Sequence, residues 1–527
     1  MHYQKPSKAA PASPRVVHRS SRRKEALIAL AHGCSALNQS LLTSAATSSK
    51  QTRSRFFLLS LAILALISAP AQRATATDWP TYRFDNRRSG VTPESIPLPL
   101  APAWTHISAT PPQMAWTGPA KWDSYANLRG LEAMRNFDPA FFVVVVADAV
   151  YFGSSVDDGV HCLDAKTGKE KWVLYADGPV RLPPAWHQGK VYFGSDDGYA
   201  YCLDADQGTL VWKRKPSGKE TLLLNNGKLI SHWPCRTGVL VQDDLAYFGA
   251  SLLPWESSYL CAADAQTGSD EGPGRYRIKL EHLTMQGAML ATPTQLYLPQ
   301  GRQRPEMFDR ATGRSVGGIG DSGQGGVFAL VTRTDEFVHG GGQNHGTDGE
   351  LRGFDANSRD YFVTFPKATR IVLTEEVAYL NTGAELAGFA RARYVELAKR
   401  KTQLQTRQKA IRELLKKLRN QENDAQRKNL LGELDTIEPE LTALAPKMEA
   451  CYLWKTDTGC PHELILAGKT LFAGGNDRVA AFDTTSGKIL WSAAVTGKAH
   501  GLVVANGRLF VSTDRGTIHC FGLSAAK

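Results

Sequence analysis

The chain has 527 residues, of which 42% are hydrophobic, and this is enough for a large buried core. Its net charge of +11 at pH 7 is concentrated in residues 1–76, which contain eleven Lys or Arg and a single acid, Glu25. The remaining 451 residues carry only +1. The charge pattern therefore excludes a protein whose folded part binds nucleic acid.

Residues 1–76 have the features of an export leader. Arg53 and Arg55 precede an apolar run over residues 56–71, and small residues follow, ending in Ala74-Thr75-Ala76. A basic flank, a short apolar core and an A-x-A pattern are typical of a cleaved signal peptide. The alternative is an uncleaved membrane anchor, although the run is shorter than a comfortable span. Residues 1–50 are long for a leader, so the true start can lie downstream of Met1. We expect a protein of the periplasm or cell envelope.

A strand-turn-strand unit recurs along the rest of the chain. Each copy has a β-branched and aromatic strand ending at Gly, an Asp/Gly turn, and a second alternating strand ending in Asp. A Thr-Gly or Ser-Gly turn then leads to a strand with a Trp eight residues after the Asp. The clearest copies are 148–172, 189–212 and 468–491. A Trp at a fixed place in each sheet can pack against the neighbouring sheet, and the candidates are Trp104, Trp172, Trp212 and Trp491.

Eight copies can be aligned, and they predict an all-β, eight-bladed β-propeller. The aligned positions are 151, 192, 247, 297, 337, 379, 471 and 509, and only one spacing, of 92 residues, is too long for a four-stranded blade. The last blade lacks its fourth strand, because the chain ends at Lys527. Leu100 to Thr105 forms an outer strand with its own Trp and no blade. We therefore expect strands from both termini to close the ring, with blades in residues 78–389 and 450–527.

The D-x-x-T-G-K-x-x-W repeat, the eightfold count and the opening Asp78-Trp79-Pro80 resemble the pyrroloquinoline-quinone (PQQ) repeat propellers. The resemblance covers about residues 78–389 and 450–522. That superfamily includes quinoprotein alcohol dehydrogenases and the non-enzymatic BamB-type outer-membrane assembly lipoproteins. The resemblance implies a fold and leaves the activity open. Its enzymes use adjacent cysteines, a Trp beneath PQQ and a calcium ion, but no two cysteines adjoin in this sequence.

Residues 390–449 explain the long spacing. Leu397, Leu404, Ile411 and Leu418 recur every seven residues, and the apolar residues of 430–448 alternate steps of four and three, which predicts two helices of a coiled-coil hairpin. The first arm, 390–420, carries +9 and the second, 421–450, carries −4, so the arms can pair. Pro439 and Pro446 predict a kink or break in the second arm. The hairpin is either a partner-binding arm or local packing on the propeller.

Four of the eight cysteines, Cys162, Cys202, Cys261 and Cys520, fall at one repeat position in separate blades, so we interpret them as small buried hydrophobic residues. Cys451 and Cys460 flank the strand after the hairpin, and an oxidising compartment can join them in a disulfide.

The residues that precede the innermost strands line the propeller channel. They are polar, and a ring of such groups suits an anionic or polar ligand, or simply water. The candidate channel residues are Arg181, Arg236, Gln286, Gln324, His462 and His500. No catalytic set and no metal site can be assigned from the sequence.

Three functions follow. The favoured one is a non-enzymatic, exported, monomeric scaffold that contacts protein partners through residues 390–449 or one mouth of the propeller. The second is a quinoprotein-like oxidoreductase with PQQ and calcium in the channel, held by Arg181 and Arg236. The third is a propeller that binds a sugar or another small molecule.

Overall fold

A computed structural model of the chain describes residues 76–115, 137–301, 303–321, 325–326, 328–340, 350–418 and 424–523. The chain divides into two units, Met1–Gln72 and Arg73–Lys527, and all described residues belong to the second unit. The predicted signal peptide, with its apolar run at 56–71, lies outside them.

The described residues of the second unit are mostly β-structure in antiparallel sheets of four strands. The first sheet contains β3 (Val143–Val146), β4 (Ala149–Gly153), β5 (Gly159–Asp164) and β6 (Glu170–Tyr175). The second contains β7 (Ala185–His187), β8 (Lys190–Gly194), β9 (Ala200–Asp204) and β10 (Leu210–Arg214). The third contains β13 (Leu240–Gln242), β14 (Leu245–Ala250), β15 (Ser258–Asp264) and β16 (Tyr276–Leu280). The fourth contains β17 (Leu290–Ala291), β18 (Gln295–Gln300), β19 (Gln303–Asp309) and β20 (Ser315–Gly318).

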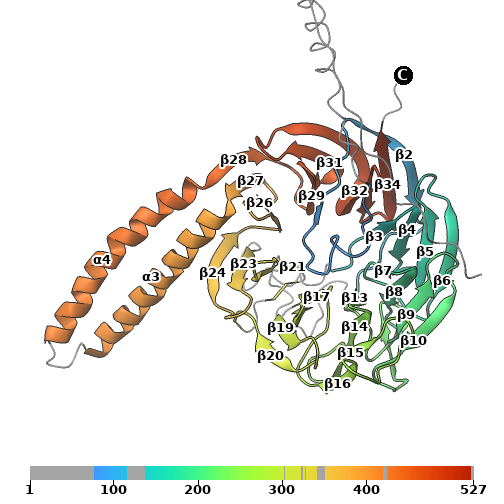
Figure 1. Cartoon of the computed structure of the whole chain (residues 1–527), viewed down its shortest axis with the longest axis horizontal. Helices are drawn as coiled ribbons and strands as arrows, with labels where there is room; N and C mark the ends of the chain where they lie inside the picture. The colour runs from blue at the N-terminus through green and yellow to red at the C-terminus, as the bar shows by residue number, and fades with distance from the viewer. Residues whose placement is uncertain are drawn as a thin grey trace, which may run out of the picture. The chain divides into compact units, whose positions relative to one another are not determined.

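The fifth sheet contains β21 (Phe328–Val331), β22 (Glu336–Gly340), β23 (Glu350–Asp355) and β24 (Tyr361–Pro366). The sixth contains β25 (Arg370–Leu373), β26 (Val377–Asn381), β27 (Glu385–Ala390) and β28 (Tyr452–Asp457). A small hairpin of β11 (Leu222–Asn225) and β12 (Lys228–Ser231) stands between the second and third sheets. Figure 1 shows the sheets following one another around a ring, with the first strand of each sheet innermost. This confirms the predicted all-β propeller class.

One larger sheet joins the two ends of the ring. It runs through β1 (Val91–Thr92), β29 (Glu463–Ala467), β30 (Thr470–Gly474), β31 (Asn476–Asp483), β32 (Ile489–Ala505), β33 (Arg508–Thr513), β34 (Thr517–Leu523) and β2 (Leu100–Ile107). The long strand β32 pairs first with β31 and then with β33, so this sheet consists of two four-stranded halves flanked by β1. Six single sheets and this double sheet are the arrangement that eight four-stranded blades require. The N-terminal strand β2 pairs with β34, and we call this junction the closing seam.

The repeat sequence forms each unit through local hydrogen bonds. In the first sheet, the Asp164 carboxylate accepts hydrogen bonds from the Lys166 amide (3.1 Å) and the Thr167 amide (2.8 Å), which folds the Thr-Gly turn. Gly168 then takes a positive φ of 70°, a conformation that favours glycine. The Asp264 and Asp483 turns repeat this pattern. The D-x-x-T-G motif is therefore a turn, and its Asp is structural.

Each repeat tryptophan binds the turn of the next sheet. In four of the five pairs, the indole N–H donates a hydrogen bond to the carbonyl of the residue that follows the turn Asp. In the fifth, it donates to the carbonyl of the first residue of β2. The distances are 2.9–3.1 Å. The donor–acceptor pairs are Trp104–Ala165, Trp172–Ala205, Trp212–Ala265, Trp454–Thr484 and Trp491–Leu100. A Cβ on the turn glycine would clash with the ring, since it would lie 2.6 Å from Trp104 at Gly168 and 2.5 Å from Trp172 at Gly208. Adjacent sheets are thus held together by the tryptophan ring of one sheet, packed on the turn glycine of the next and hydrogen-bonded to its carbonyl. We call this contact a tryptophan lock.

The insertion forms two helices, α3 (Arg391–Lys417) and α4 (Asp424–Glu449), within the predicted range 390–449. Figure 1 shows them projecting outside the ring beside β24 and β28. The two arms are antiparallel and pair through bidentate bonds, Arg400 with Glu440 and Arg407 with Glu433. The predicted break at Pro439 and Pro446 is wrong, because α4 continues through both prolines. Each proline removes only one N–H from the helix.

Among the described residues, no helix has the length and apolar content that crossing a bilayer requires.

Candidate functional site: the loop mouth of the propeller

Two of the predicted channel residues, Arg181 and Arg236, lie at one end of the ring. An antiparallel pair brings the start of an innermost strand to the same end as the turn after the second strand. Residues 178–184 before β7, residues 232–239 before β13, and the turns at 154–158 and 195–198 therefore share this end. We call it the loop mouth.

Asp196 organises the loop mouth and brings two of the predicted residues together. Its Oδ1 accepts a hydrogen bond from Nε of Arg236 at 2.7 Å. Its Oδ2 accepts two hydrogen bonds, one from Nη2 of Arg236 at 2.7 Å and one from Nε of Arg181 at 2.6 Å. Arg181 also donates to Oδ2 of Asp138 at 2.7 Å. Arg236 is only 1% exposed and Asp196 also 1%. The two predicted arginines are therefore already bound by carboxylates of this chain.

Burial and charge act against each other in this group. Burial alone would raise the pKa of Asp196, but Arg181 and Arg236 outweigh it and hold that pKa below its usual value. Burial raises the pKa of Asp138, and Arg181 opposes that rise. Oδ1 of Asp138 has no hydrogen-bond partner among the described residues. The cluster is a buried ion-pair network, and in such a network losing one member is more costly than the network's net contribution.

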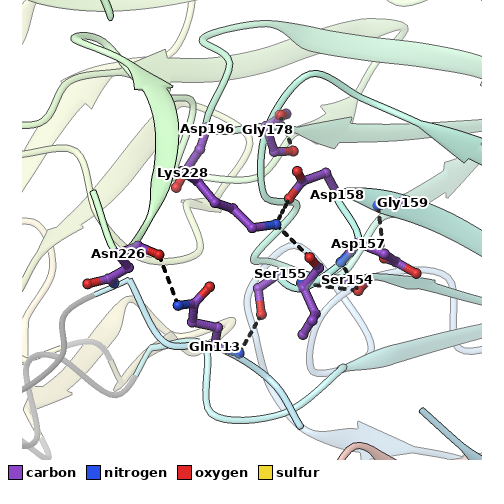
Figure 2. Close-up of polar contacts among 12 residues, drawn as sticks. Gln113, Ser154, Ser155, Asp157, Asp158, Gly159, Gly178, Asp196, Asn226 and Lys228 are labelled. Atoms are coloured by element: carbon purple, nitrogen blue, oxygen red, sulfur yellow. Dashed lines mark hydrogen bonds and ion pairs between the residues drawn. The ribbon is translucent and has the colours of Figure 1, made fainter. Parts of the chain in front are cut away.

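A second group of polar contacts ties the loops together beside this network (Figure 2). The Gln113 amide donates to Oγ of Ser155 at 3.0 Å, and its side chain donates to the carbonyl of Asn226 at 3.2 Å. Lys228 pairs with Asp158 and donates to the carbonyl of Val156 at 2.6 Å. The β11–β12 hairpin is thus fixed over the loop mouth.

The two predicted histidines lie together in the double sheet. The rings of His462 and His500 are 4.6 Å apart between centroids, and His462 pairs with Oδ1 of Asn476 at 2.8 Å. Burial, with smaller effects from His462 and Arg370, lowers the pKa of His500 to about 3. Burial also lowers the pKa of His462. Both rings are therefore neutral at pH 7, and neither offers a positive charge to an anion.

The two predicted glutamines do not join either group. Gln286 is buried and forms a bridge with Gln300 in the fourth sheet. Gln324 lies outside the described residues.

The N-terminal segment 77–92 crosses the opposite end of the ring, which the sequence did not predict. Trp79 exchanges backbone hydrogen bonds with Val145 of β3, Asn86 donates to the carbonyl of Val241 of β13, and Arg88 donates to the carbonyl of Met289 just before β17. Val91 then pairs with Leu466 of β29. One segment therefore contacts innermost strands of sheets far apart in sequence, and the ring is tied across its centre.

The centre of the ring holds a small cavity of about 30 Å³. Apolar and aromatic side chains make up most of its lining, including Tyr82, Phe137, Phe142, Leu182 and Phe328, and Arg370 adds a cation. The volume suits a water molecule or two, whereas ligand pockets are about ten times larger or more.

These residues do not fit PQQ and calcium. The predicted arginines are engaged by Asp196 and Asp138, and the cavity is too small for a fused three-ring quinone. No group of three or more His, Cys, Asp or Glu in the described part of the chain is placed to hold a metal ion.

The predicted pairing of Cys451 and Cys460 is not formed. Both are free thiols, and they pack in different clusters: Cys451 with the hairpin and fifth sheet, Cys460 with Leu464 and the double sheet. The repeat cysteines Cys162, Cys202, Cys261 and Cys520 are also free and buried, as expected for small hydrophobes.

Sequence reasoning missed Asp138, Asp196 and Trp454. Asp196 was interpreted only as a turn residue, although its turn and Arg181 share one end of the ring. Trp454 follows the insertion directly, so the D-x-x-T-G signal that normally precedes the Trp was lost.

A protein-family profile described as "Outer membrane protein assembly factor BamB" matches residues 115–272 and 449–526. Over these two segments the chain is similar to the PQQ-repeat β-propeller proteins, as the repeat in its sequence predicts. A quinohemoprotein alcohol dehydrogenase from Pseudomonas putida HK5 shares the fold, with a TM-score of 0.50, 11% identity, and coverage of 85% of this chain and 81% of that one. BamB from Moraxella catarrhalis aligns with a TM-score of 0.46 and 13% identity, over 80% of this chain and 100% of its own.

Among curated proteins, this chain is similar to a 1-butanol dehydrogenase (cytochrome c) from Thauera butanivorans. The two are 27% identical over 175 residues, which is 30% of this chain. The match spans about a quarter (24%) of that relative's length.

Proposed function

We propose that this chain is a non-enzymatic, exported propeller that serves as a platform for protein partners in the cell envelope. The observation that carries the proposal is the engagement of Arg181 and Arg236 by Asp196, because these are the two cations that the sequence offered to an anionic cofactor in the channel. The description of the matching family, an assembly factor, agrees with this role. The leader in residues 1–76 supports export.

The loop mouth carries an exposed apolar face suited to a partner. Leu224 and Leu229 are paired across the β11–β12 hairpin, and Leu222 lies two residues away on the same face. These leucines are 52% (Leu222), 72% (Leu224) and 61% (Leu229) exposed. Exposed apolar groups gathered on one protrusion are typical of protein contact surfaces. The α3–α4 hairpin offers a second surface, on a helical arm that extends beyond the ring.

A binding experiment tests this role. The protein from Thr77 onward, with a photo-crosslinker beside Leu224, is added to envelope extract, and crosslinked partners are identified. We expect Leu224→Asp to abolish the capture. Leu453→Asp is the matched control, because Leu453 is 57% exposed on the outer strand β28. Equal capture by both variants would contradict a partner site at the loop mouth.

A quinoprotein oxidoreductase is the second candidate, favoured by the identity with the butanol dehydrogenase over 175 residues. It predicts saturable binding of PQQ with calcium and reduction of a dye by an alcohol. The platform predicts neither. A small-molecule sensor would bind a sugar without turnover, and calorimetric titration with sugars separates that case.

A further inference from the structure

The point where the leader meets the folded unit contains a buried carboxylate. Glu94 is 1% exposed, and it lies just after β1, the strand that ends the segment crossing the ring. Its Oε2 accepts the backbone N–H of Thr77 at 2.8 Å and that of Asn506 at 3.0 Å. Its Oε1 accepts the N–H of Gly507 at 2.5 Å. Asn506 and Gly507 form the turn between β32 and β33, so Glu94 joins Thr77 to the double sheet.

Asp78 reinforces the same junction. Its Oδ1 accepts the Ala147 amide at 2.7 Å, in the turn between β3 and β4, and the Asn506 side chain at 3.2 Å. Residues 77 and 78 are therefore fastened to turns of the first sheet and of the double sheet at once. Ala76, immediately before them, is exposed.

We propose that the Ala76–Thr77 bond is a processing site and that cleavage creates an ion pair that strengthens the folded ring. A signal-peptidase-type hydrolase adds water across this peptide bond. The hydroxyl of water goes to the Ala76 carbonyl carbon and gives a carboxylate on the released leader. The Thr77 nitrogen leaves as an amine and takes up a proton at neutral pH.

The geometry favours the charged product over the uncleaved amide. In the precursor, the Thr77 nitrogen donates one neutral N–H to Glu94. In the product, the same nitrogen is an ammonium 2.8 Å from a buried carboxylate, a distance normal for a charge-assisted hydrogen bond. The sequence Ala74-Thr75-Ala76 places small residues at the two positions that the hydrolase recognises. Cleavage thus couples removal of the leader to a more stable ring.

The proposal rests on the export part of the proposed function, and its central test needs no partner. Two proteins are compared, one that begins at Thr77 and one that retains Thr75 and Ala76 and therefore carries its amine two residues away. Each is made with Glu94 and with Glu94→Gln, which keeps an acceptor for the backbone amides. Residues 73–527 form a compact unit, so both starts retain the folded part.

Thermal unfolding at pH 6.5 is the measurement. We expect the Thr77 start to raise the Tm by about 1–2 °C with Glu94, and by nothing with Glu94→Gln. The advantage should fall as the pH rises past about 8, where a free amine loses its proton. Equal Tm values for the two starts, or an advantage that persists in Glu94→Gln, would overturn the ion pair. The first comparison changes only the terminus, so it holds even if Glu94→Gln fails to fold.

The terminal residue of the native protein gives an independent check. Protein extracted from envelopes of producing cells should begin at Thr77 by terminal sequencing. Any other first residue overturns the processing site, while the platform role is judged separately by the crosslinking experiment.

Discussion

The closing seam and the junction between the fifth and sixth sheets connect neighbouring sheets by different means. At the closing seam, Trp491 donates to the carbonyl of Leu100, and Trp104 of the same strand β2 donates to that of Ala165. The N-terminal strand β2 thus accepts a hydrogen bond from one repeat tryptophan and donates the next through its own tryptophan. At the other junction, no D-x-x-T-G turn is present, and α3 begins where that turn would stand.

The first residues of α3 make contacts equivalent to those of the missing D-x-x-T-G turn. The Arg391 amide donates to the Glu376 carbonyl at 2.8 Å, as the Ala165 amide does to Asp148 in the first sheet at 3.0 Å. In place of a tryptophan lock, Oγ1 of Thr402 donates to the carbonyl of Phe362 in β24 at 3.1 Å. Tyr394 packs on Phe365 and Phe389, one ring from each of the two sheets.

The comparison separates two parts of the hairpin. Its root, around Arg391, Tyr394 and Leu397, belongs to the core that joins the fifth and sixth sheets. In its outer part, Arg407 of α3 pairs with Glu433 of α4, and Ile411 and Leu430 belong to the same apolar cluster. Local packing and a partner-binding arm were the alternatives from the sequence. The root shows local packing, and partner binding by the outer part stays a prediction.

The largest effect is expected at the closing seam. Trp104→Ala removes the ring and the hydrogen bond that fasten β2 to the first sheet, and should cost about 3–5 kcal/mol of unfolding free energy. Gly168→Ala should destabilise the same contact from the turn of the first sheet, because a Cβ at a φ of 70° would lie 2.6 Å from the Trp104 ring. Denaturant unfolding measures both.

Trp255→Ala is the matched control for the seam, since that ring is 64% exposed. It should change the unfolding free energy by less than about 0.5 kcal/mol. If Trp104→Ala were as mild as Trp255→Ala, the tryptophan lock would not be what holds the ring closed.

The second prediction divides the hairpin root from its outer part. Tyr394→Ala should destabilise the whole propeller by about 3 kcal/mol, because it opens a cavity between two sheets. Leu430→Ala, farther out on α4, should loosen the helices and leave the propeller intact. Hydrogen exchange read by mass spectrometry distinguishes these results, since only Tyr394→Ala should speed exchange in β24 and β27. Equal spread of both effects would contradict the division.

The third prediction concerns pH at the closing seam. His161 contacts Glu170 at 2.8 Å and Asp157 at 3.1 Å, and it stacks on Phe152, which also contacts His106 of β2. Burial would lower the pKa of His161, but the two carboxylates outweigh it and raise the pKa. A raised folded pKa gives stability that is fully present below the unfolded value of about 6.5 and is lost as pH rises through the folded value.

His161→Gln should therefore cost about 1 kcal/mol at pH 5.5 and less at pH 9. The pKa of His106 is lowered, chiefly by burial, so its own contribution runs in the opposite direction. Comparing His161→Gln with the parent at each pH cancels the contribution of His106. A cost that grows with pH would show that the two carboxylates do not hold the His161 charge.

Sequence predicted the features that are local and repeated. The alternating strands, the Asp-capped turns and the Trp position recur at a regular spacing, so the propeller class and the place of β2 beside the last strand followed from periodicity. The charge difference between the arms likewise predicted that they pair, and the bond of Arg400 with Glu440 is one instance.

What sequence could not show depends on contacts between distant residues that occur once. Nothing near Arg181 or Arg236 in the sequence indicates that Asp138 is a partner. The sequence offered these two arginines as ligand-binding groups, but in the structure they form a buried ion-pair network. The path of residues 77–92 across the ring is also invisible to periodicity, because that segment repeats nothing. A disulfide between Cys451 and Cys460 was a possibility from the sequence, but the two thiols pack in different clusters.

The smallest effect is expected from the exposed ion pairs that link the outer arms. Arg407 and Glu433 form a bidentate pair at 2.6 and 2.7 Å, with side chains half and one-third exposed. Water and salt screen such a pair, and ordering two long side chains opposes it. Arg407→Gln and Glu433→Gln, alone or together, should shift the Tm by less than about 1 °C. Arg391→Gln is the contrasting variant, because Arg391 and its partner Glu336 are mostly buried at the root. That change should lower the Tm several times more, and 0.5 M NaCl should remove the Arg407 effect while leaving the Arg391 effect. A comparable loss at both positions would mean that the outer arm, like the root, is part of what holds the ring together.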